Sequence, residues 1–199
     1  MEYYKKNLKP KMFDEVKKDS TNFFILRHDV EFSVERAYKL AKFEKQILKI
    51  KSSYFFQLRN NAYNILSVEN KRKIHKIKKM GHKIGLHFNY KGPADKKKIN
   101  SELLEQNFIF QKEFNSNYCF FSPHRPSLNQ YLLKVSLPKK INTYNPLYFT
   151  DFSDAKKNPT KTIYLADSRH TWKYLHPIKL DLNKHRKVQL VFHPDAWTI

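Results

Sequence analysis

The sequence has few cysteines and no long apolar run. Its one cysteine, Cys119, excludes an internal disulfide and any zinc site built from a cysteine cluster, and it favours a reducing compartment with Cys119 as a small core residue. No stretch approaches the roughly 18 consecutive apolar residues of a membrane-spanning helix, and the opening MEYYKKNLKPKMF lacks the apolar segment of a secretory signal. These absences predict a cytoplasmic location without a transmembrane segment, and they leave peripheral membrane contact open.

Acidic side chains are also scarce, since 18 Asp and Glu stand against 39 Lys and Arg and give a formal net charge of +21. Such a surplus can serve nucleic-acid binding. Here the bases are spread along the chain, as in KRKIHKIKKM and ADKKKIN, with no zinc-finger or RNA-recognition signature. Solvated helix faces account for most of this charge, so no nucleic-acid partner is expected. The remaining positive charge suits an anionic substrate or an anionic membrane surface better than nucleic acid.

The apolar residues form a repeating pattern of strand and helix. With 40% hydrophobic residues and no linker, residues 1–199 are expected to form a single domain. Three helices are predicted, with Ser33, Ser67 and Asp95 at their starts and Gly81 as the stop of the second. Strands are predicted at 23–27, 52–58, 83–88, 117–121, 141–144, 161–166 and 187–192.

This alternation predicts an α/β fold with about seven parallel strands, in which ligands bind at the carboxyl ends of the strands. Polar side chains follow five of the predicted strands, and we expect them to converge on one mouth. These residues are Arg27, His28, Asp29 and Glu31; His87; His124 and Arg125; Asp167, Arg169 and His170; and His193 and Asp195. His82 opens its strand at the opposite end, so we expect it to be structural.

Five segments of the chain resemble the five motifs of the polysaccharide deacetylase family, the NodB-like carbohydrate esterases. RHDVEF, GHKIGLHF, HRPS, ADSRHTW and FHPDAW occur in the family's order and approximate spacing, between residues 23 and 197. The resemblance is to small divergent members with a His-Asp-Val-Asp-like first motif. It implies an irregular, incomplete (β/α) barrel, which suits a chain shorter than the roughly 250 residues of a full barrel.

The resemblance also implies roles for the strand-end residues in hydrolysis of an N-acetyl group. That reaction needs an activated water, positive charge for the developing oxyanion, and an acid for the departing amine. A zinc-type divalent ion with an open position supplies the first two. The implied catalytic residues are Asp29 as base, Arg125 as its partner, His193 as general acid and Asp167 as the carboxylate that tunes it, and the implied metal ligands include Glu31 and His87.

Two departures from the family pattern concern the metal. Lys91 occupies the position of the family's second metal histidine, and Glu31 replaces a shorter aspartate. The predicted metal set is therefore Glu31, His87 and His124, and the alternatives for the third ligand are His170, Asp29 or no ion at all.

Three functions follow from these residues. The leading one is a metal-dependent deacetylase, with zinc as the expected ion, acting on an acetylated amino sugar in a nucleotide- or lipid-linked cytoplasmic precursor of a surface glycan. The second is a carbohydrate-binding relative without metal or hydrolysis, which the replacement of the second histidine by Lys91 motivates. The third is a basic nucleic-acid-binding protein. Metal content separates the first two, and salt dependence of oligonucleotide binding addresses the third.

Overall fold

The structure, a computed structural model, describes residues 1–115, 120–168 and 171–197. Its sheet has seven strands, all paired in parallel, in the order β5-β4-β3-β2-β1-β7-β6. The strands are β1 (Phe23–Val30), β2 (Ser53–Phe56), β3 (Lys83–Phe88), β4 (Phe120–Pro123), β5 (Ile141–Asn142), β6 (Ile163–Ala166) and β7 (Lys187–Phe192). The predicted parallel α/β fold is confirmed, while Cys119, Arg169 and His170 lie outside the described residues.

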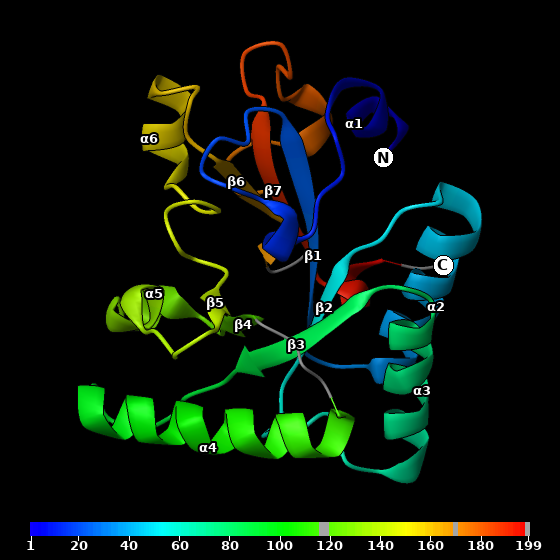
Figure 1. Ribbon diagram of the computed structural model, residues 1–199, viewed down its shortest axis with the longest axis vertical. Coiled ribbons are helices and arrows are strands. Elements are labelled where there is room, and N and C mark those ends of the chain that lie inside the picture. The colour runs from blue at the N-terminus through cyan, green and yellow to red at the C-terminus, as the bar shows by residue number, and fades with distance from the viewer. Residues whose placement is uncertain (116–119, 169–170, 198–199) are drawn as a thin grey trace.

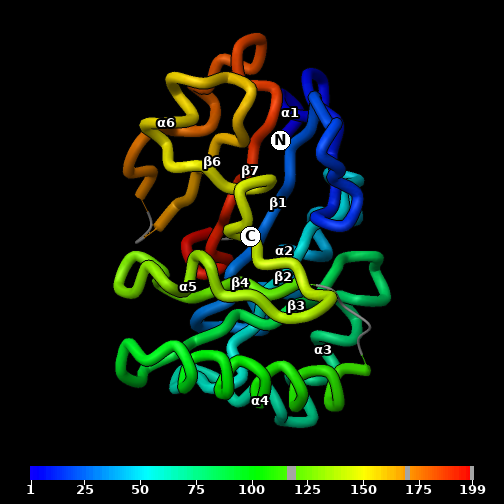
Figure 2. Tube along the Cα trace, turned by 60° about the vertical axis from the view of Figure 1, so that its left-hand side comes forward, coloured from blue at the N-terminus to red at the C-terminus, as the bar shows by residue number. Residues whose placement is uncertain are grey.

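The sheet curls into a partly closed barrel. Its edge strands β5 and β6 do not pair with each other in the described part of the chain. Figure 1 shows α2 and α3 side by side next to β2 and β3, with α4 below β3, so these three helices cover the outer side of the curl. Figure 2 shows the chain between α5 and α6 crossing the open side. The predicted incomplete (β/α) barrel is therefore confirmed.

The helices begin where the capping residues predict. Ser33 and Ser67 accept hydrogen bonds from the backbone nitrogens of the first turns, Asp95 accepts two, and Gly81 has a left-handed φ of 93° after the second long helix. The helices are α1 (Glu2–Asn7), α2 (Val34–Phe43), α3 (Val68–Lys79), α4 (Lys96–Phe114), α5 (Tyr131–Lys134) and α6 (Phe152–Lys157). Shorter turns are η1 (Phe13–Glu15), the π-helical η2 (Glu44–Leu48), η3 (Pro126–Leu128), η5 (Pro177–Lys179) and η6 (Pro194–Ala196).

Alternate residues of β1 pack on opposite faces of the sheet. Phe23 and Ile25 belong to one core cluster, and Phe24 and Leu26 belong to the other. Arg27 continues the row of Phe23 and Ile25 and is fully buried. The strand that builds the core thus also carries polar residues into the carboxyl end of the curl.

Gly85 in β3 allows the strands to approach closely. A Cβ atom at this position would lie 2.8 Å from a ring carbon of Phe55 and 2.9 Å from the carbonyl oxygen of Phe120. Real Cβ atoms essentially never come this close to other atoms. The ring of Phe55 fills this space instead, and it packs under the guanidinium of Arg27 at 5.7 Å.

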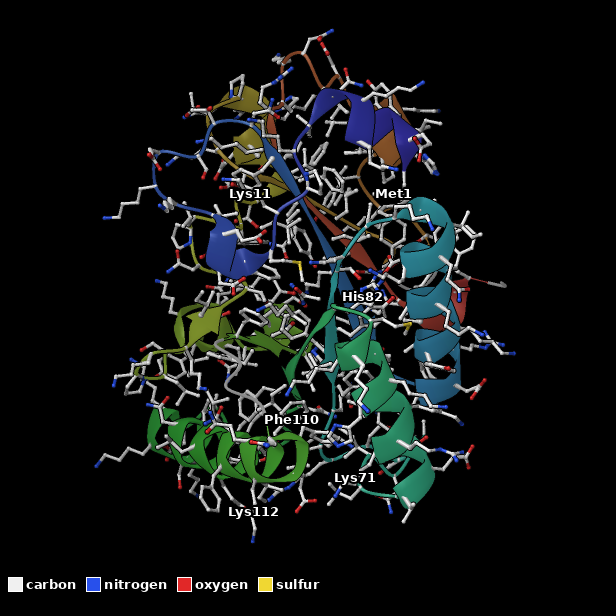
Figure 3. All side chains as sticks on the ribbon, turned by 45° about the vertical axis from the view of Figure 1, so that its right-hand side comes forward. Met1, Lys11, Lys71, His82, Phe110 and Lys112 are labelled. Atoms are coloured by element: carbon white, nitrogen blue, oxygen red, sulfur yellow. The ribbon has the colours of Figure 1, made fainter. Side chains whose placement is uncertain are left out.

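His82 belongs to a buried polar network, as expected from its place at the start of β3. Its Nε2 lies 3.0 Å from the carbonyl oxygen of Ala41, and its Nδ1 lies 3.0 Å from the Ser52 hydroxyl (Figure 3). The network centres on Glu44, whose carboxylate accepts hydrogen bonds from Ser52 at 2.5 Å and Tyr54 at 2.8 Å. These bonds join the end of α2 to β2, and His82 is structural.

Candidate active site

The carboxyl ends of five strands bring most of the predicted residues to one place. Asp29 lies near the end of β1 and His87 near the end of β3, while His124, Asp167 and His193 directly follow β4, β6 and β7. Glu31 is the meeting point, because its Oε1 lies within 4 Å of the Nε2 atoms of three histidines. The distances are 3.0 Å from His124, 3.6 Å from His87 and 3.9 Å from His193.

Asp29 forms a two-point ion pair with Arg27, two residues earlier in the same strand. The Nε and Nη2 atoms of Arg27 donate to Oδ1 and Oδ2 at 2.9 and 2.6 Å. Burial opposes ionisation, yet the nearby Arg27 charge prevails and lowers the pKa of Asp29 to about 2. Arg27 is held in turn by Gln189, at 3.1 Å from Nη1, and by the Ser122 hydroxyl. Asp29 is therefore ionised throughout the physiological range.

Arg125 does not make the contact that the resemblance implies. It is exposed, with a left-handed φ of 45° at the start of η3, and the guanidinium that pairs with Asp29 is that of Arg27. The physical reason is register, because residues 27 and 29 project from the same face of β1. A role for Arg125 in the reaction stays a prediction.

Glu31, His87 and His124 form a cluster suited to a metal ion. One ligand atom from each residue lies within 4.8 Å of the others. His87 is buried, and its Nε2 has no hydrogen-bond partner among the described residues. A buried nitrogen without a partner is costly in an apolar interior, and a metal ion would satisfy it.

The other ring nitrogens of both histidines are fixed by acceptors outside the cluster. His87 Nδ1 lies 3.0 Å from the carbonyl oxygen of Ser122, and His124 Nδ1 lies 3.1 Å from Oδ1 of Asn89. Both acceptors require a proton on Nδ1, so that in the neutral form of each ring the lone pair lies on Nε2, toward Glu31. This is the tautomer that a metal ligand needs.

The electrostatics of Glu31 favour the charged ligand form. Burial raises the pKa of Glu31, but the neighbouring rings of His124 and His87 outweigh it and hold that pKa far below its usual range. Burial lowers the pKa of His124, which favours its neutral ring. One carboxylate and two imidazoles match the donors preferred by zinc and similar divalent ions, so the residues present fit the predicted ion.

His193 is oriented by Asp167. Its Nδ1 lies 2.7 Å from Oδ1 of Asp167, and the Trp197 indole donates to Oδ2 of the same carboxylate at 2.7 Å. Burial lowers the pKa of His193, but the hydrogen bond to Asp167 outweighs it and the net pKa is raised. The protonated ring is favoured, and its Nε2 faces Glu31.

Lys91 lies outside the metal cluster, although the family pattern puts a metal histidine at this position. It is exposed in the loop after β3, and His124, which follows β4, completes the cluster instead. Sequence reasoning missed Asn89, Ser122 and Trp197 as partners of the site. Each acts through an amide, a carbonyl or an indole, groups whose chemistry leaves no signal in the sequence alone.

No protein-family model matches the chain, and no curated protein matches it. Several solved structures are similar to the chain. The chain is similar to the chitin deacetylase of the fungal pathogen Colletotrichum lindemuthianum, with 14% identity, 94% of this chain and 77% of that one covered, and a TM-score of 0.56. A family 4 acetyl xylan esterase from Clostridium thermocellum, in complex with a cobalt ion, is 16% identical over 86% of this chain and 73% of that one, with a TM-score of 0.50.

A third match is the Xyl-CE4 domain of a multidomain xylanase from the hindgut metagenome of Trinervitermes trinervoides, at 11% identity. It covers 89% of this chain and 78% of that one, with a TM-score of 0.51. The chain spans 58% of the length of a further match, a mutant of a family 4 pseudoenzyme with restored activity. At these identities the likeness establishes the fold, which is the NodB-like fold of the family 4 carbohydrate esterases and confirms the predicted resemblance in fold.

None of the described helices is both long and apolar enough to cross a membrane.

Proposed function

We propose that the chain is a metal-dependent hydrolase that removes an N-acetyl group from an amino sugar, with zinc as the expected ion. The observation that carries the proposal is the cluster of Glu31, His87 and His124, in which both imidazoles present Nε2 to one carboxylate oxygen. The fold also supports it, since the matching structures include a chitin deacetylase and a cobalt-bound acetyl xylan esterase.

The ion, held by Glu31, His87 and His124, would supply positive charge for the carbonyl oxygen of the acetyl group as it becomes an oxyanion. Asp29 stands beside this position, with Oδ2 at 3.8 Å from Nε2 of His87. It takes the proton of the water that attacks the acetyl carbon. Because Arg27 keeps it ionised, Asp29 is available as the proton acceptor at every working pH.

His193 is the proposed general acid of the reaction. Its raised pKa favours the imidazolium, which donates a proton to the sugar nitrogen as the C–N bond breaks. Asp167 fixes the ring through Nδ1 and stabilises its charge. The products are acetate and a free amine on the sugar, and the protons balance between Asp29 and His193.

The proposed substrate also has a group attached to the sugar and a cellular compartment. A nucleotide- or lipid-linked precursor of a surface glycan in the cytoplasm is the substrate that the sequence predicts. The basic charge supports an anionic carrier, since a net charge of +21 raises the local concentration of anions. Fractionation of the producing cells tests the compartment.

Acetate release from acetylated amino-sugar oligomers tests the activity. We expect release by the protein as purified, loss of release after treatment with a chelator, and its return with added zinc or cobalt. His87→Ala should lose activity, while His75→Ala, which removes a histidine of α3 from outside the cluster, should keep it. Metal-loaded protein that binds acetylated sugars without releasing acetate would support the carbohydrate-binding alternative instead.

A further inference from the structure

A polar cavity of about 770 Å³ opens next to the metal cluster, between the loops that follow β2 and β3. Its lining includes Arg59, Asn60, Asn61, Asn64, Asn89 and Lys91. Its volume falls within the range of about 300–1,000 Å³ that small-molecule sites occupy. The proposed hydrolysis uses none of these side chains directly.

The cavity shares two walls with the metal cluster. Asn89 lines it and also holds Nδ1 of His124 at 3.1 Å. Asn60 lines it and donates to the backbone oxygen of Glu31 at 2.8 Å. Both amides also donate to Oε1 of Gln57, each at 3.0 Å, so one buried side chain fixes the two walls. A ligand in the cavity would therefore lie directly beside the metal ligands.

The charge of the cavity is carried by Lys91. The other cation, Arg59, is paired with Glu102, which also lines the cavity, at 3.1 Å, and with Glu105 at 2.9 Å. In the ranges of the chain that the structure describes, no carboxylate pairs with Lys91. The ammonium group is therefore available to an anion that enters the cavity.

Asn64 adds a hydrogen-bond donor to the cavity beside Lys91. Asn64 uses its Oδ1 to accept from the backbone of Leu66 at 2.9 Å, which leaves its Nδ2 as a donor. The loop of Lys91 is compact, because Tyr90 packs over Gly92, where a Cβ would lie 2.5 Å from the Tyr90 hydroxyl. Tyr90 also donates to the carbonyl oxygen of Pro93 at 2.8 Å. The position of Lys91 at the rim is thus supported by its loop.

We infer that this cavity binds a phosphate group attached to the acetylated sugar, with Lys91 as its charged contact. The inference rests on the proposed function, because it assumes that the acetyl group occupies the neighbouring metal cluster. A phosphate suits a compact ammonium with amide donors beside it, and it would complement the charge that Lys91 leaves unpaired. Lys91, which stands at the position of the family's second metal histidine, would then bind substrate instead of a metal ion.

Equilibrium binding of N-acetylglucosamine 1-phosphate and of neutral N-acetylglucosamine, measured by calorimetry on metal-loaded protein, tests the inference. We expect the phosphorylated sugar to bind at least about tenfold more tightly. Lys91→Ala should remove this preference and leave binding of the neutral sugar unchanged. Lys91→Arg should retain part of it. Lys112→Ala, at the far end of α4 (Figure 3), is the control and should bind both sugars as the parent does.

Equal affinity for the two sugars, or an unchanged preference in Lys91→Ala, would overturn the inference. Neither result affects the proposed hydrolysis, which acetate release measures separately. Conversely, a Lys91-dependent preference in a protein that releases no acetate would support the cavity and contradict the hydrolysis. Binding of uridine-diphosphate N-acetylglucosamine alongside the 1-phosphate distinguishes a nucleotide carrier from a lipid phosphate.

Discussion

Asp29 is ionised because Arg27 holds both of its oxygens, and the same contact makes it a weak base. A carboxylate with a pKa of about 2 accepts a proton poorly from ordinary water. A divalent ion held by Glu31, His87 and His124 would offset this weakness, because such an ion makes a nearby water more acidic. The proposed mechanism therefore needs both Asp29 and the metal cluster.

Replacing Asp29 by Asn tests its role as the base. The amide keeps the shape of the side chain but cannot take the proton, so turnover should fall at least about a hundredfold. The change also leaves the buried Arg27 without its carboxylate, so we expect a loss of stability of about 3–5 kcal/mol. Denaturation followed by circular dichroism sets the temperature at which activity is compared. Near-normal turnover of folded Asp29→Asn would assign the base to another residue, such as Glu31.

Asp167→Asn tests the general acid through its pH dependence. The Asp167 carboxylate raises the pKa of His193, so the ring stays protonated to higher pH than a free histidine. Activity that needs this proton is present below the raised pKa and is lost as the pH rises through it. In Asp167→Asn the alkaline limb of the kcat/KM profile should move to lower pH. An unmoved limb would show that the limb belongs to another group.

At the scale of elements, the ends of the strands position the site. Capping residues and apolar runs in the sequence predict where most of the helices and strands lie. Ser33, Ser67, Asp95 and Gly81 mark helix boundaries because capping uses neighbours in the sequence. The residues of two strands were predicted without error, at 83–88 and 187–192. The predicted first helix instead divides into α2 and a π-helical turn, which local periodicity does not distinguish.

The sequence predicts that the metal-cluster residues meet, because each lies at the end of a strand. It does not predict which atoms contact one another. His124 completes the cluster because β4 pairs with β3, a relation between segments 35 residues apart. Arg27 took the place expected for Arg125 because side chains of one strand alternate between faces. The pairing of two strands that are distant in the sequence cannot be predicted from the residues of either strand alone.

Gly85→Ala tests the close approach of β2, β3 and β4. The added methyl would meet the ring of Phe55 and the backbone of Phe120 at less than 3 Å. The strands would have to shift, at an expected cost of about 1–3 kcal/mol. Chemical denaturation measures this cost. An unchanged free energy of unfolding would mean that the ring of Phe55 moves aside freely.

Glu44→Ala tests the buried network of Glu44, which also includes His28 of β1, with Nε2 at 2.7 Å from Oε1 of Glu44. The substitution leaves the hydroxyls of Ser52 and Tyr54 without their acceptor, and we expect a loss of about 3–5 kcal/mol. Glu35→Ala on the surface of α2 removes only a half-exposed pair with Lys73 and should cost less than about 1 kcal/mol. Equal losses in the two variants, measured by the same denaturation, would contradict a structural role for the network.

At the scale of the whole molecule, the charge of +21 surrounds a site that is itself rich in carboxylates and imidazoles. Part of the basic surface lies on α3, where Lys71, Arg72, Lys76, Lys78 and Lys79 line a second hollow. This charge attracts polyanions without reading their sequence. Lys71 in this hollow is already paired with Glu113 of α4, at 2.8 Å.

Oligonucleotide binding tests whether this surface has a nucleic-acid function. We expect weak association that has no sequence preference and falls steeply between about 50 and 200 mM salt, as counterion release requires. Fluorescence anisotropy with two unrelated sequences measures both properties. Tight, sequence-dependent binding at the higher salt concentration would favour the nucleic-acid alternative over the hydrolase.

Elemental analysis of protein purified without chelator tests the proposed metal centre most directly, because the proposed hydrolysis depends on the ion. We expect about one divalent ion per chain, and its loss in Glu31→Ala, His87→Ala and His124→Ala with the fold retained, since these residues lie at strand ends outside the apolar core. His75→Ala should keep the ion. A parent protein without metal, or ligand variants with unchanged metal content, would contradict the metal centre.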